Sequence, residues 1–301
     1  MNVLITGGTG LLGRALTRSF LADNHKVWVL TRSPERAVLP LGVTALGWDG
    51  RSANGWGHIV NEMDAIINLA GLNTSSWPWT EARKQAFWNS RVWAGQAVSS
   101  AIQSAVKRPR VLIQSSGINY YGLRGEAATE STSHGEDFLA RLASAWEFSS
   151  QPVEDIGVRR VVIRTSVVLA RENIIMKLLD LPARLFVGGR LGDGRQYLPW
   201  IHIADYVSSV RFLLDTERAH GPYNLIAPEA STNAEFLRLL SQTLHRPYWF
   251  HIPSLLMRIP LGDMSVTVLE GRKSIPQKLV EAGYKFKFPT LQSALADLYA
   301  R

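Results

Sequence analysis

VLITGGTGLLG, at residues 3–13, is the stretch that decides the fold of this chain. Its apolar start predicts a buried strand, and apolar spacing over residues 11–22 predicts a helix. Gly7, Gly10 and Gly13 lie between them with the spacing G-x-x-G-x-x-G, which in this context is typical of a dinucleotide site. Gly7 permits a tight turn, Gly10 lets the backbone approach a pyrophosphate, and Gly13 lets the helix pack closely. The free N–H groups and positive dipole of the helix start favour the phosphates.

Further strands and helices alternate after this turn. Strands are expected at residues 26–30, 43–46, 65–70, 110–114 and 160–163, and helices at residues 80–106 and 138–149. Continuous apolar strands that alternate with helices indicate a parallel sheet covered on both faces. The predicted class is therefore α/β, a Rossmann doubly wound parallel sheet with a smaller C-terminal α+β region that covers the substrate.

The expected domain division falls near residue 165, where glycines begin to interrupt the regular pattern. Residues 1–165 are predicted to form the Rossmann domain and residues 166–301 the smaller region. A strand and a helix between about residues 200 and 226 are expected to return to the first domain. The proline-containing tail at 251–301 is expected to pack on the sheet domain as several short pieces.

Composition excludes several kinds of site and partner. The 301 residues contain no cysteine, which rules out disulfides, thiolate metal ligands and cysteine nucleophiles. The net charge is +8, but no run of five basic residues occurs, so we expect neither nucleic acid nor membrane as a partner. The histidines are scattered, and no metal site is expected. Without a signal peptide or a long apolar span, a cytoplasmic protein is expected.

The end of the second strand bears on the choice of dinucleotide. It reads Thr31-Arg32-Ser33, whereas an NAD site usually has an acidic residue there for the ribose 2′-hydroxyl. A guanidinium instead suits a 2′-phosphate, with Arg14 and Arg36 as further candidates. We therefore predict NADP as the cofactor. The alternative is that Arg32 is a solvated surface residue.

Asn68-Leu69-Ala70-Gly71 ends the fourth predicted strand. Its small residues would let a cofactor lie across the carboxyl edge of the sheet. Ala70 and Gly71 are expected to approach the cofactor. For Asn68 the alternative, a buried side chain that bonds to backbone, remains open.

These motifs, together with Ser115-Ser116 and Tyr121-Gly122, resemble the extended short-chain dehydrogenase/reductase superfamily. Segments 164–169, 188–197, 200–203 and 223–225 are similar to its YfcH-like branch, whose members carry the label NADP-dependent nucleotide-sugar epimerase. The resemblance covers nearly the whole chain. It implies these cofactor-binding residues: Gly7, Thr9, Gly10, Leu11, Leu12, Gly13, Thr31, Arg32, Leu69, Ala70, Gly71, Ser90 and Val167. Val167 would contribute a backbone contact, and its alternative is core packing.

The usual catalytic pair of the superfamily is missing. Its members use a Tyr-x-x-x-Lys pair, in which Lys holds the ribose and Tyr passes a proton, with a Ser or Thr that orients the substrate. Counting back from Trp146-Glu147 places the Tyr and Lys positions near Phe138 and Leu142, with Arg141 as the only cation close by. The usual hydroxyl position falls on Gly117. Ordinary reductase or epimerase chemistry is therefore in question.

Four other side chains are the catalytic candidates. Tyr121, or its neighbour Tyr120, is a candidate acid, and Ser115 or Ser116 a candidate to orient the substrate. Tyr121 is alternatively a turn residue that packs beside the cofactor. If none of them acts, NADP is a structural or sensing ligand without hydride transfer.

On the substrate side, the resemblance implies that Arg195 binds a substrate diphosphate, with a structural salt bridge as the alternative. Trp79, with Trp77, follows the fourth strand and is expected to form an aromatic wall over the substrate or the nicotinamide; core or interface packing is the alternative. His202 and Asp205 are expected to be structural.

The leading functional hypothesis is an NADP-dependent oxidoreductase or epimerase with a small-molecule substrate, phosphorylated and nucleotide-linked compounds being candidates. The alternative is a non-catalytic NADP(H)-binding redox sensor or partner-binding module. The long helices near residues 80–106 and 135–150 resemble those that pair in homodimers of the superfamily, so a homodimer is a further expectation.

Overall fold

The central sheet of the computed structural model, which describes residues 1–300, contains seven parallel strands. Residue 301, which the expected C-terminal region included, lies outside the described residues. The strands are β1 (Asn2–Thr6), β2 (Lys26–Thr31), β3 (Val43–Gly47), β4 (Ala65–Asn68), β5 (Val111–Gly117), β6 (Arg159–Thr165) and β10 (Gly221–Leu225). Their order, β10-β6-β5-β4-β1-β2-β3, contains the Rossmann order, and the predicted fold class is confirmed.

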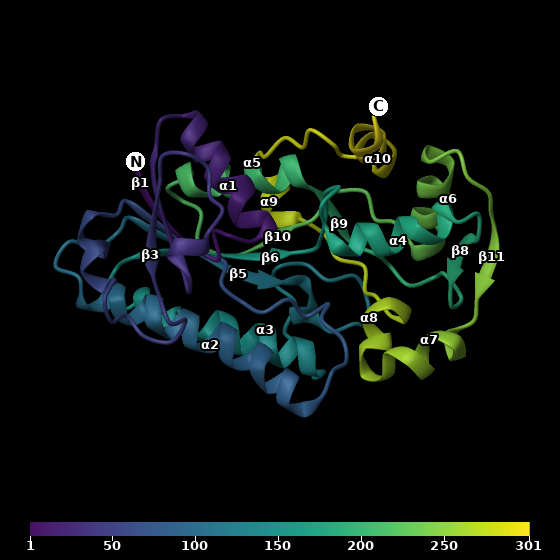
Figure 1. Ribbon diagram of the computed structural model, residues 1–301, viewed down its shortest axis with the longest axis horizontal. Coiled ribbons are helices and arrows are strands. Elements are labelled where there is room, and N and C mark those ends of the chain that lie inside the picture. The colour runs from purple at the N-terminus through teal and green to yellow at the C-terminus, as the bar shows by residue number, and fades with distance from the viewer. Residues whose placement is uncertain (301) are drawn as a thin grey trace.

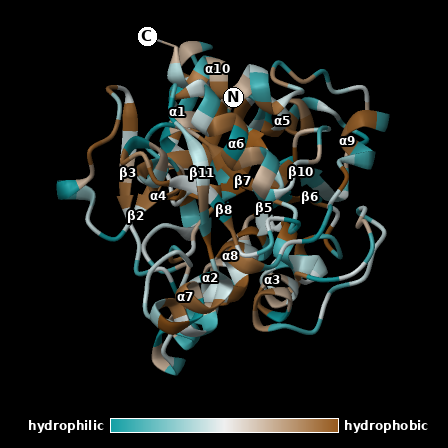
Figure 2. Ribbon diagram, turned by 90° about the vertical axis from the view of Figure 1, so that its right-hand side faces the viewer, coloured by the Kyte–Doolittle hydropathy of each residue, from teal (hydrophilic) through white to brown (hydrophobic). Residues whose placement is uncertain are grey.

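Helices cover both faces of this sheet (Figure 1). Helices α1 (Leu11–Ala22) and α5 (Ile203–Asp215) lie on one face, and α2 (Glu81–Ser104) and α3 (Phe138–Phe148) lie on the other. Alternate strand residues point to opposite faces. Val3 and Ile5 therefore pack in one core cluster, whereas Leu4 belongs to the cluster beneath α2. The strands carry mostly the hydrophobic colours in Figure 2, as burial on both faces requires.

The remaining elements form a region beside the carboxyl ends of the strands (Figure 1). Two short sheets pair β7 (Val167–Leu169) with β9 (Trp200–His202) and β8 (Gly188–Leu191) with β11 (Tyr248–Ile252). The helices of this region are α4 (Ile174–Arg184), α6 (Asn233–Thr243), α7 (Ser254–Leu261), α8 (Val266–Leu269) and α10 (Leu291–Tyr299), whereas α9 (Gln277–Glu281) packs on β10 of the central sheet. Short 3-10 helices occur in both parts of the chain: η1 (Pro34–Arg36), η2 (Gly57–Glu62), η3 (Ile118–Tyr121) and η4 (Gln151–Val153) in the sheet domain, and η5 (Gly262–Ser265) in the C-terminal region.

The C-terminal segment that follows β11 packs against the sheet domain through a buried carboxylate. Asp205 in the first turn of α5 is fully buried. Its Oδ1 accepts hydrogen bonds from the Tyr284 hydroxyl at 2.9 Å and the Lys287 N–H at 2.8 Å. Its Oδ2 accepts from the Phe288 N–H at 2.9 Å. Three donors from the C-terminal segment thus offset the cost of burying this charge.

His202 begins α5 as its N-cap residue. The ring Nδ1 accepts the Ala204 N–H at 3.2 Å, so the neutral tautomer carries its proton on Nε2. Burial lowers the pKa of His202, although Asp297 nearby acts in the opposite direction. His202 and Asp205 therefore serve the fold.

No helix within residues 1–300 is both long and apolar enough to span a lipid bilayer.

Candidate functional site

A cleft of about 1130 Å³ lies at the carboxyl ends of the central strands, where the strand order reverses between β1 and β4. This is where open α/β sheets bind ligands. Its walls come from the glycine turn, the ends of β2, β4, β5 and β6, and the facing sides of α2 and α3. The residues that the family resemblance implied for the cofactor all line it: Gly7, Thr9, Gly10, Leu11, Leu12, Gly13, Thr31, Arg32, Leu69, Ala70, Gly71, Ser90 and Val167.

The glycine turn is shaped for a close approach of backbone and ligand. Gly7 has φ +66°, and a Cβ there would lie 2.9 Å from the Leu69 carbonyl oxygen. A Cβ on Gly13 would overlap the backbone of Gly7 and Gly8, so only glycine lets α1 start so near β1. The N-cap Gly10 has no side chain to cap the helix, which leaves first-turn N–H groups directed to the cleft. These features fit a dinucleotide pyrophosphate.

A buried hydrogen-bond network fixes the turn after β4. The Thr6 hydroxyl donates to Asn68 Oδ1 at 2.6 Å and accepts the Leu69 and Ala70 N–H groups at 3.1 Å each. Asn68 Nδ2 donates to Gln114 Oε1 at 2.9 Å. Asn68 is fully buried, so its role is to hold β1, β4 and β5 together beneath the cleft. Gln114 was not predictable as a member of this network, because nothing in the local sequence marks its partner.

Arg32 lies at the cleft rim with an exposed side chain and forms no salt bridge within residues 1–300. Arg36 lies outside the cleft lining, with its Nε 3.8 Å from Glu35. Arg14 donates to the Thr9 carbonyl at 3.0 Å, which braces the glycine turn. Among the three predicted arginines, Arg32 is thus the one that lines the cleft at the end of β2.

The cleft-facing side of α3 is apolar. Asp137 caps this helix by accepting the Ala140 N–H at 2.9 Å, which sets its start. Its residues in the cleft lining are Leu139, Leu142, Ala143 and Trp146. Phe138 lies outside that lining. The two α3 residues that are spaced four apart and line the cleft are therefore Leu139 and Ala143. Each lies one residue later than the pair expected from sequence, Phe138 and Leu142. Arg141 is exposed and donates to the Glu136 carbonyl at 2.7 Å.

The structure argues against Tyr121 as the acid, which corrects that prediction. Tyr121 is 1% exposed and is absent from the cleft lining. Its hydroxyl donates to Asn224 Oδ1 at 2.6 Å and accepts from Arg164 Nη1 at 2.9 Å. Burial raises the pKa of Tyr121 to about 12, even though Arg164 acts to lower it. An enclosed hydroxyl with both partners in place has no path to a substrate.

The two serines of β5 both line the cleft but differ in their partners. Ser116 Oγ donates to Glu147 Oε1 at 2.7 Å, which commits its proton to the protein. Ser115 is 7% exposed, and its Oγ forms no hydrogen bond within the part of the chain that the structure describes. Of the two candidates, Ser115 is the one with a hydroxyl free to contact a ligand.

A buried ion pair supports this wall of the cleft from behind. Arg164 Nε and Nη2 donate to the two Glu147 carboxylate oxygens at 2.8 and 2.9 Å. Their side chains are 4% and 13% exposed, respectively. Burial acts to lower the pKa of Arg164, but hydrogen bonds and charge from Glu147 raise it overall. The pair therefore joins α3 to β6 and holds Ser116 and Tyr121 in place.

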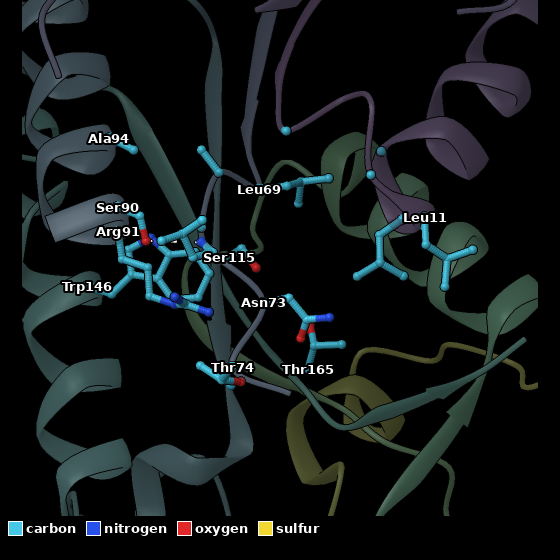
Figure 3. Close-up of a pocket in the computed structure, with 18 of the residues that line it drawn as sticks. Leu11, Leu69, Asn73, Thr74, Ser90, Arg91, Ala94, Ser115, Trp146 and Thr165 are labelled. Atoms are coloured by element: carbon cyan, nitrogen blue, oxygen red, sulfur yellow. Dashed lines mark hydrogen bonds between the residues drawn. The ribbon is translucent and has the colours of Figure 1, made fainter. Parts of the chain in front are cut away.

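Ser90 and Arg91 place α2 against the turn that follows β4. Ser90 Oγ accepts the Leu72 N–H and donates to the Phe87 carbonyl, both at 3.0 Å. The Arg91 guanidinium lies 4.9 Å from the Trp146 ring centre, and Figure 3 shows the two side chains against each other in the cleft. Burial lowers the pKa of Arg91 to about 10, and the group remains charged at neutral pH. No motif in the local sequence marks Arg91 as a residue of the cleft.

The two predicted substrate residues lie away from the main cleft. Trp79 is absent from its lining and packs edge-on against Phe87 and Phe138 at ring distances of 6.0 and 5.9 Å. Its indole Nε1 donates to the Thr74 carbonyl at 2.9 Å. Trp79 therefore contributes to the cleft only by holding Thr74, which lines it. Arg195 lines a second, separate hollow of about 530 Å³. Trp79 is thus packed against other aromatic rings, Trp77 is 57% exposed and outside the cleft lining, and Arg195 does not line the dinucleotide cleft.

Comparison with known proteins agrees with this geometry. Residues 3–225 match the model of the NAD dependent epimerase/dehydratase family, and residues 252–298 match a domain of unknown function, DUF1731. The chain is 33% identical over 302 residues to the epimerase family protein YfhF of Bacillus subtilis, covering 100% of this chain and 98% of that one. It is 35% identical over 297 residues to the epimerase family protein SH2119 of Staphylococcus haemolyticus, with 98% of each covered.

Solved structures show the same similarity. The crystal structure of human epimerase family protein SDR39U1 with NADPH has a TM-score of 0.88 and 33% identity, with 99% of both chains covered. A UDP-glucuronic acid 4-epimerase from Bacillus cereus has a TM-score of 0.79 at 15% identity and shares the fold alone. The resemblance predicted from sequence is confirmed, and the chain belongs to the NAD-dependent epimerase/dehydratase family.

Proposed function

We propose that this protein is an NADP(H)-dependent oxidoreductase or epimerase that acts on a small molecule in the main cleft. The observation that carries the choice of cofactor is Arg32, a guanidinium without an ion-pair partner within residues 1–300, at the β2 end of the cleft. A fork of N–H donors suits the 2′-phosphate that distinguishes NADP from NAD. The human relative SDR39U1, described with NADPH, supports the same choice.

The cofactor would lie across the carboxyl ends of the strands, with its adenosine half at β2 and its nicotinamide half at β4 and β5. The first turn of α1 would hold the pyrophosphate, and Arg32 would hold the adenosine 2′-phosphate. The nicotinamide half would extend to the other side of β1, toward β4 and β5, where Ala70 and Ser115 line the cleft. A bound nicotinamide cofactor supplies or accepts a hydride.

Ser115 is the residue that we assign to orient the substrate oxygen. Its hydroxyl lies in the cleft without a protein partner within residues 1–300. Leu139 and Ala143, by contrast, can neither donate a proton nor bind a hydroxyl. The proton that accompanies hydride transfer would therefore pass through Ser115 or water, and not through a tyrosine on α3.

The substrate end of the cleft favours an uncharged polar substrate. Asn73, Thr74 and Asn119 line the cleft with apolar Ile118 and Ile174, and its charged residues outside the β2 and β3 ends are Arg91, assigned below to the cofactor, and Glu172, which disfavours an anionic substrate. Amide and hydroxyl groups bind carbonyl and hydroxyl oxygens without requiring charge. Because Arg195 lies in the second hollow, nothing in that position is available to bind a substrate diphosphate. We therefore place sugar-like hydroxy-carbonyl compounds ahead of nucleotide-linked ones.

The test is a titration of purified protein with NADPH and NADH, followed by quenching of tryptophan fluorescence. We expect tighter binding of NADPH, and we expect Arg32→Asp to abolish the preference. Arg18→Asp is the matched control, because Arg18 is exposed on α1 outside the cleft lining. Equal affinity of the unmodified protein for both cofactors would contradict the assignment.

Hydride transfer itself requires a second measurement. We expect NADPH oxidation with a hydroxy-carbonyl substrate and expect Ser115→Ala to lower kcat. Tight NADPH binding without turnover across such a panel would favour the non-catalytic sensor instead. Both measurements use the full chain.

A further inference from the structure

Arg91 presents a cation to the cleft without a carboxylate to neutralise it. Its Nη1 donates to the Phe87 carbonyl at 3.2 Å, and it forms no other hydrogen bond and no salt bridge within the described residues. A guanidinium has five N–H donors, so most of its hydrogen-bonding capacity is unused. Partial removal of a cation from water is costly unless acceptors replace the water. This arrangement points to a ligand with acceptor oxygens.

Close packing on both sides fixes the position of this guanidinium. A Cβ added to Gly71 would lie 3.1 Å from Arg91 Cγ and Cζ, so the side chain runs directly along the turn after β4. One helical turn further along α2, a Cβ on Gly95 would overlap the Ser149 side chain. The close approach of α2 to the end of α3 brings Arg91 onto Trp146, as Figure 3 shows. The guanidinium is therefore held between the β4 turn and α3.

That place lies on the nicotinamide side of the expected cofactor. The sheet order sets β2, with Arg32, on one side of β1, and β4 and β5 on the other. With the pyrophosphate at β1 and the 2′-phosphate at β2, the nicotinamide half reaches the side where Arg91 lies. On α3, Ala143 lines the cleft, but its side chain is too short to fill the space that a lysine there would occupy. Trp146 lies one turn further along the same face of α3.

We propose that Arg91 binds the ribose next to the nicotinamide ring of the cofactor and replaces, from α2, the lysine that relatives with the usual pair carry on α3. The fork of the guanidinium suits two neighbouring hydroxyl groups. It holds the ribose but does not supply a proton, because a guanidinium does not deprotonate near neutral pH. The inference rests on the proposed NADP(H) function.

The experiment compares two ligands by calorimetry: NADPH, and adenosine 2′,5′-bisphosphate, which lacks the nicotinamide half. We expect Arg91→Met, which keeps the apolar stem on Trp146, to weaken NADPH binding by about 10- to 100-fold, the loss typical of a hydrogen bond from a charged group. Binding of the bisphosphate should stay within about twofold, because it does not reach Arg91. Arg91→Lys should recover part of the NADPH affinity.

Arg141→Met is the matched control, since Arg141 is an exposed cation of α3 outside the cleft lining. Unchanged NADPH affinity in Arg91→Met, or equal losses for both ligands, would overturn the inference while leaving NADP(H) binding intact. Failure of the unmodified protein to bind either ligand would instead overturn the proposed function, and the inference with it. Circular dichroism spectra of all variants will establish whether they are folded. If Arg91→Met is unfolded, Arg91→Lys takes its place in the comparison of the two ligands.

Discussion

Removal of the Glu147 carboxylate should destabilise the fold far more than removal of an exposed carboxylate. Glu147→Leu would leave the Arg164 guanidinium, 4% exposed, without its two charged hydrogen bonds at 2.8 and 2.9 Å. Loss of one partner of a buried pair costs about 3–5 kcal/mol. Because Arg164 keeps its hydrogen bond to Tyr121 and its stacking on Tyr120, we expect the lower part of that range, about 3–4 kcal/mol.

Urea unfolding followed by circular dichroism measures this loss as a change in the free energy of unfolding. The double variant Glu147→Leu/Arg164→Met should lose less than the sum of the single variants, with a coupling energy of about 2 kcal/mol, since it leaves no isolated charge. Glu35→Leu is the exposed control, and its pair with Arg36 should contribute less than about 1 kcal/mol. A loss below about 1 kcal/mol in Glu147→Leu, or strict additivity in the double variant, would refute the argument.

Three further predictions concern the glycine turn, the buried tyrosine and the buried histidine. Gly13→Ala should cost about 1–3 kcal/mol and abolish fluorescence quenching by NADPH, because its methyl group meets the backbone of Gly7; normal quenching would contradict the close packing. Tyr121→Phe should lower the free energy of unfolding by about 1–2 kcal/mol but leave kcat unchanged, whereas a collapse of kcat would restore Tyr121 as the acid. The pKa of His202 lies below 6.5 in the fold, so its contribution to stability is complete above pH 6.5 and declines as the pH falls below that value. His202→Asn keeps a helix cap without titrating, and unfolding measured at pH 7 and pH 5 should show a smaller loss than in the unmodified protein; equal losses would exclude His202 as the cause.

Local patterns were sufficient to predict the sheet domain. Helix α1 begins and ends where its apolar spacing predicts, and β2 and β3 are displaced by one residue at most. The cofactor half of the cleft was predictable for the same reason. Its residues follow strand ends, and parallel strands bring their carboxyl ends to one edge without further information.

The other half of the cleft depends on tertiary contacts that no local pattern encodes. Strands β7 and β9 have three residues each, too few to show a period. Arg91 in the middle of a long helix has the pattern of a solvent-facing residue, and its contact with Trp146 arises only when α2 and α3 pack. Arg195 lies in a glycine-rich loop, so its direction could not be inferred from sequence.

The buried carboxylate of Asp205 has a consequence for the order in which the chain folds. Its hydroxyl donor, Tyr284, lies 79 residues further along the chain, and the two backbone donors follow Tyr284. Until those residues are synthesised, the three donors are missing, and the Asp205 carboxylate can be hydrated only by staying exposed to water. We therefore expect this end of α5 to be buried only after the chain has been made as far as residues 284–288, within the segment that matches a domain of unknown function.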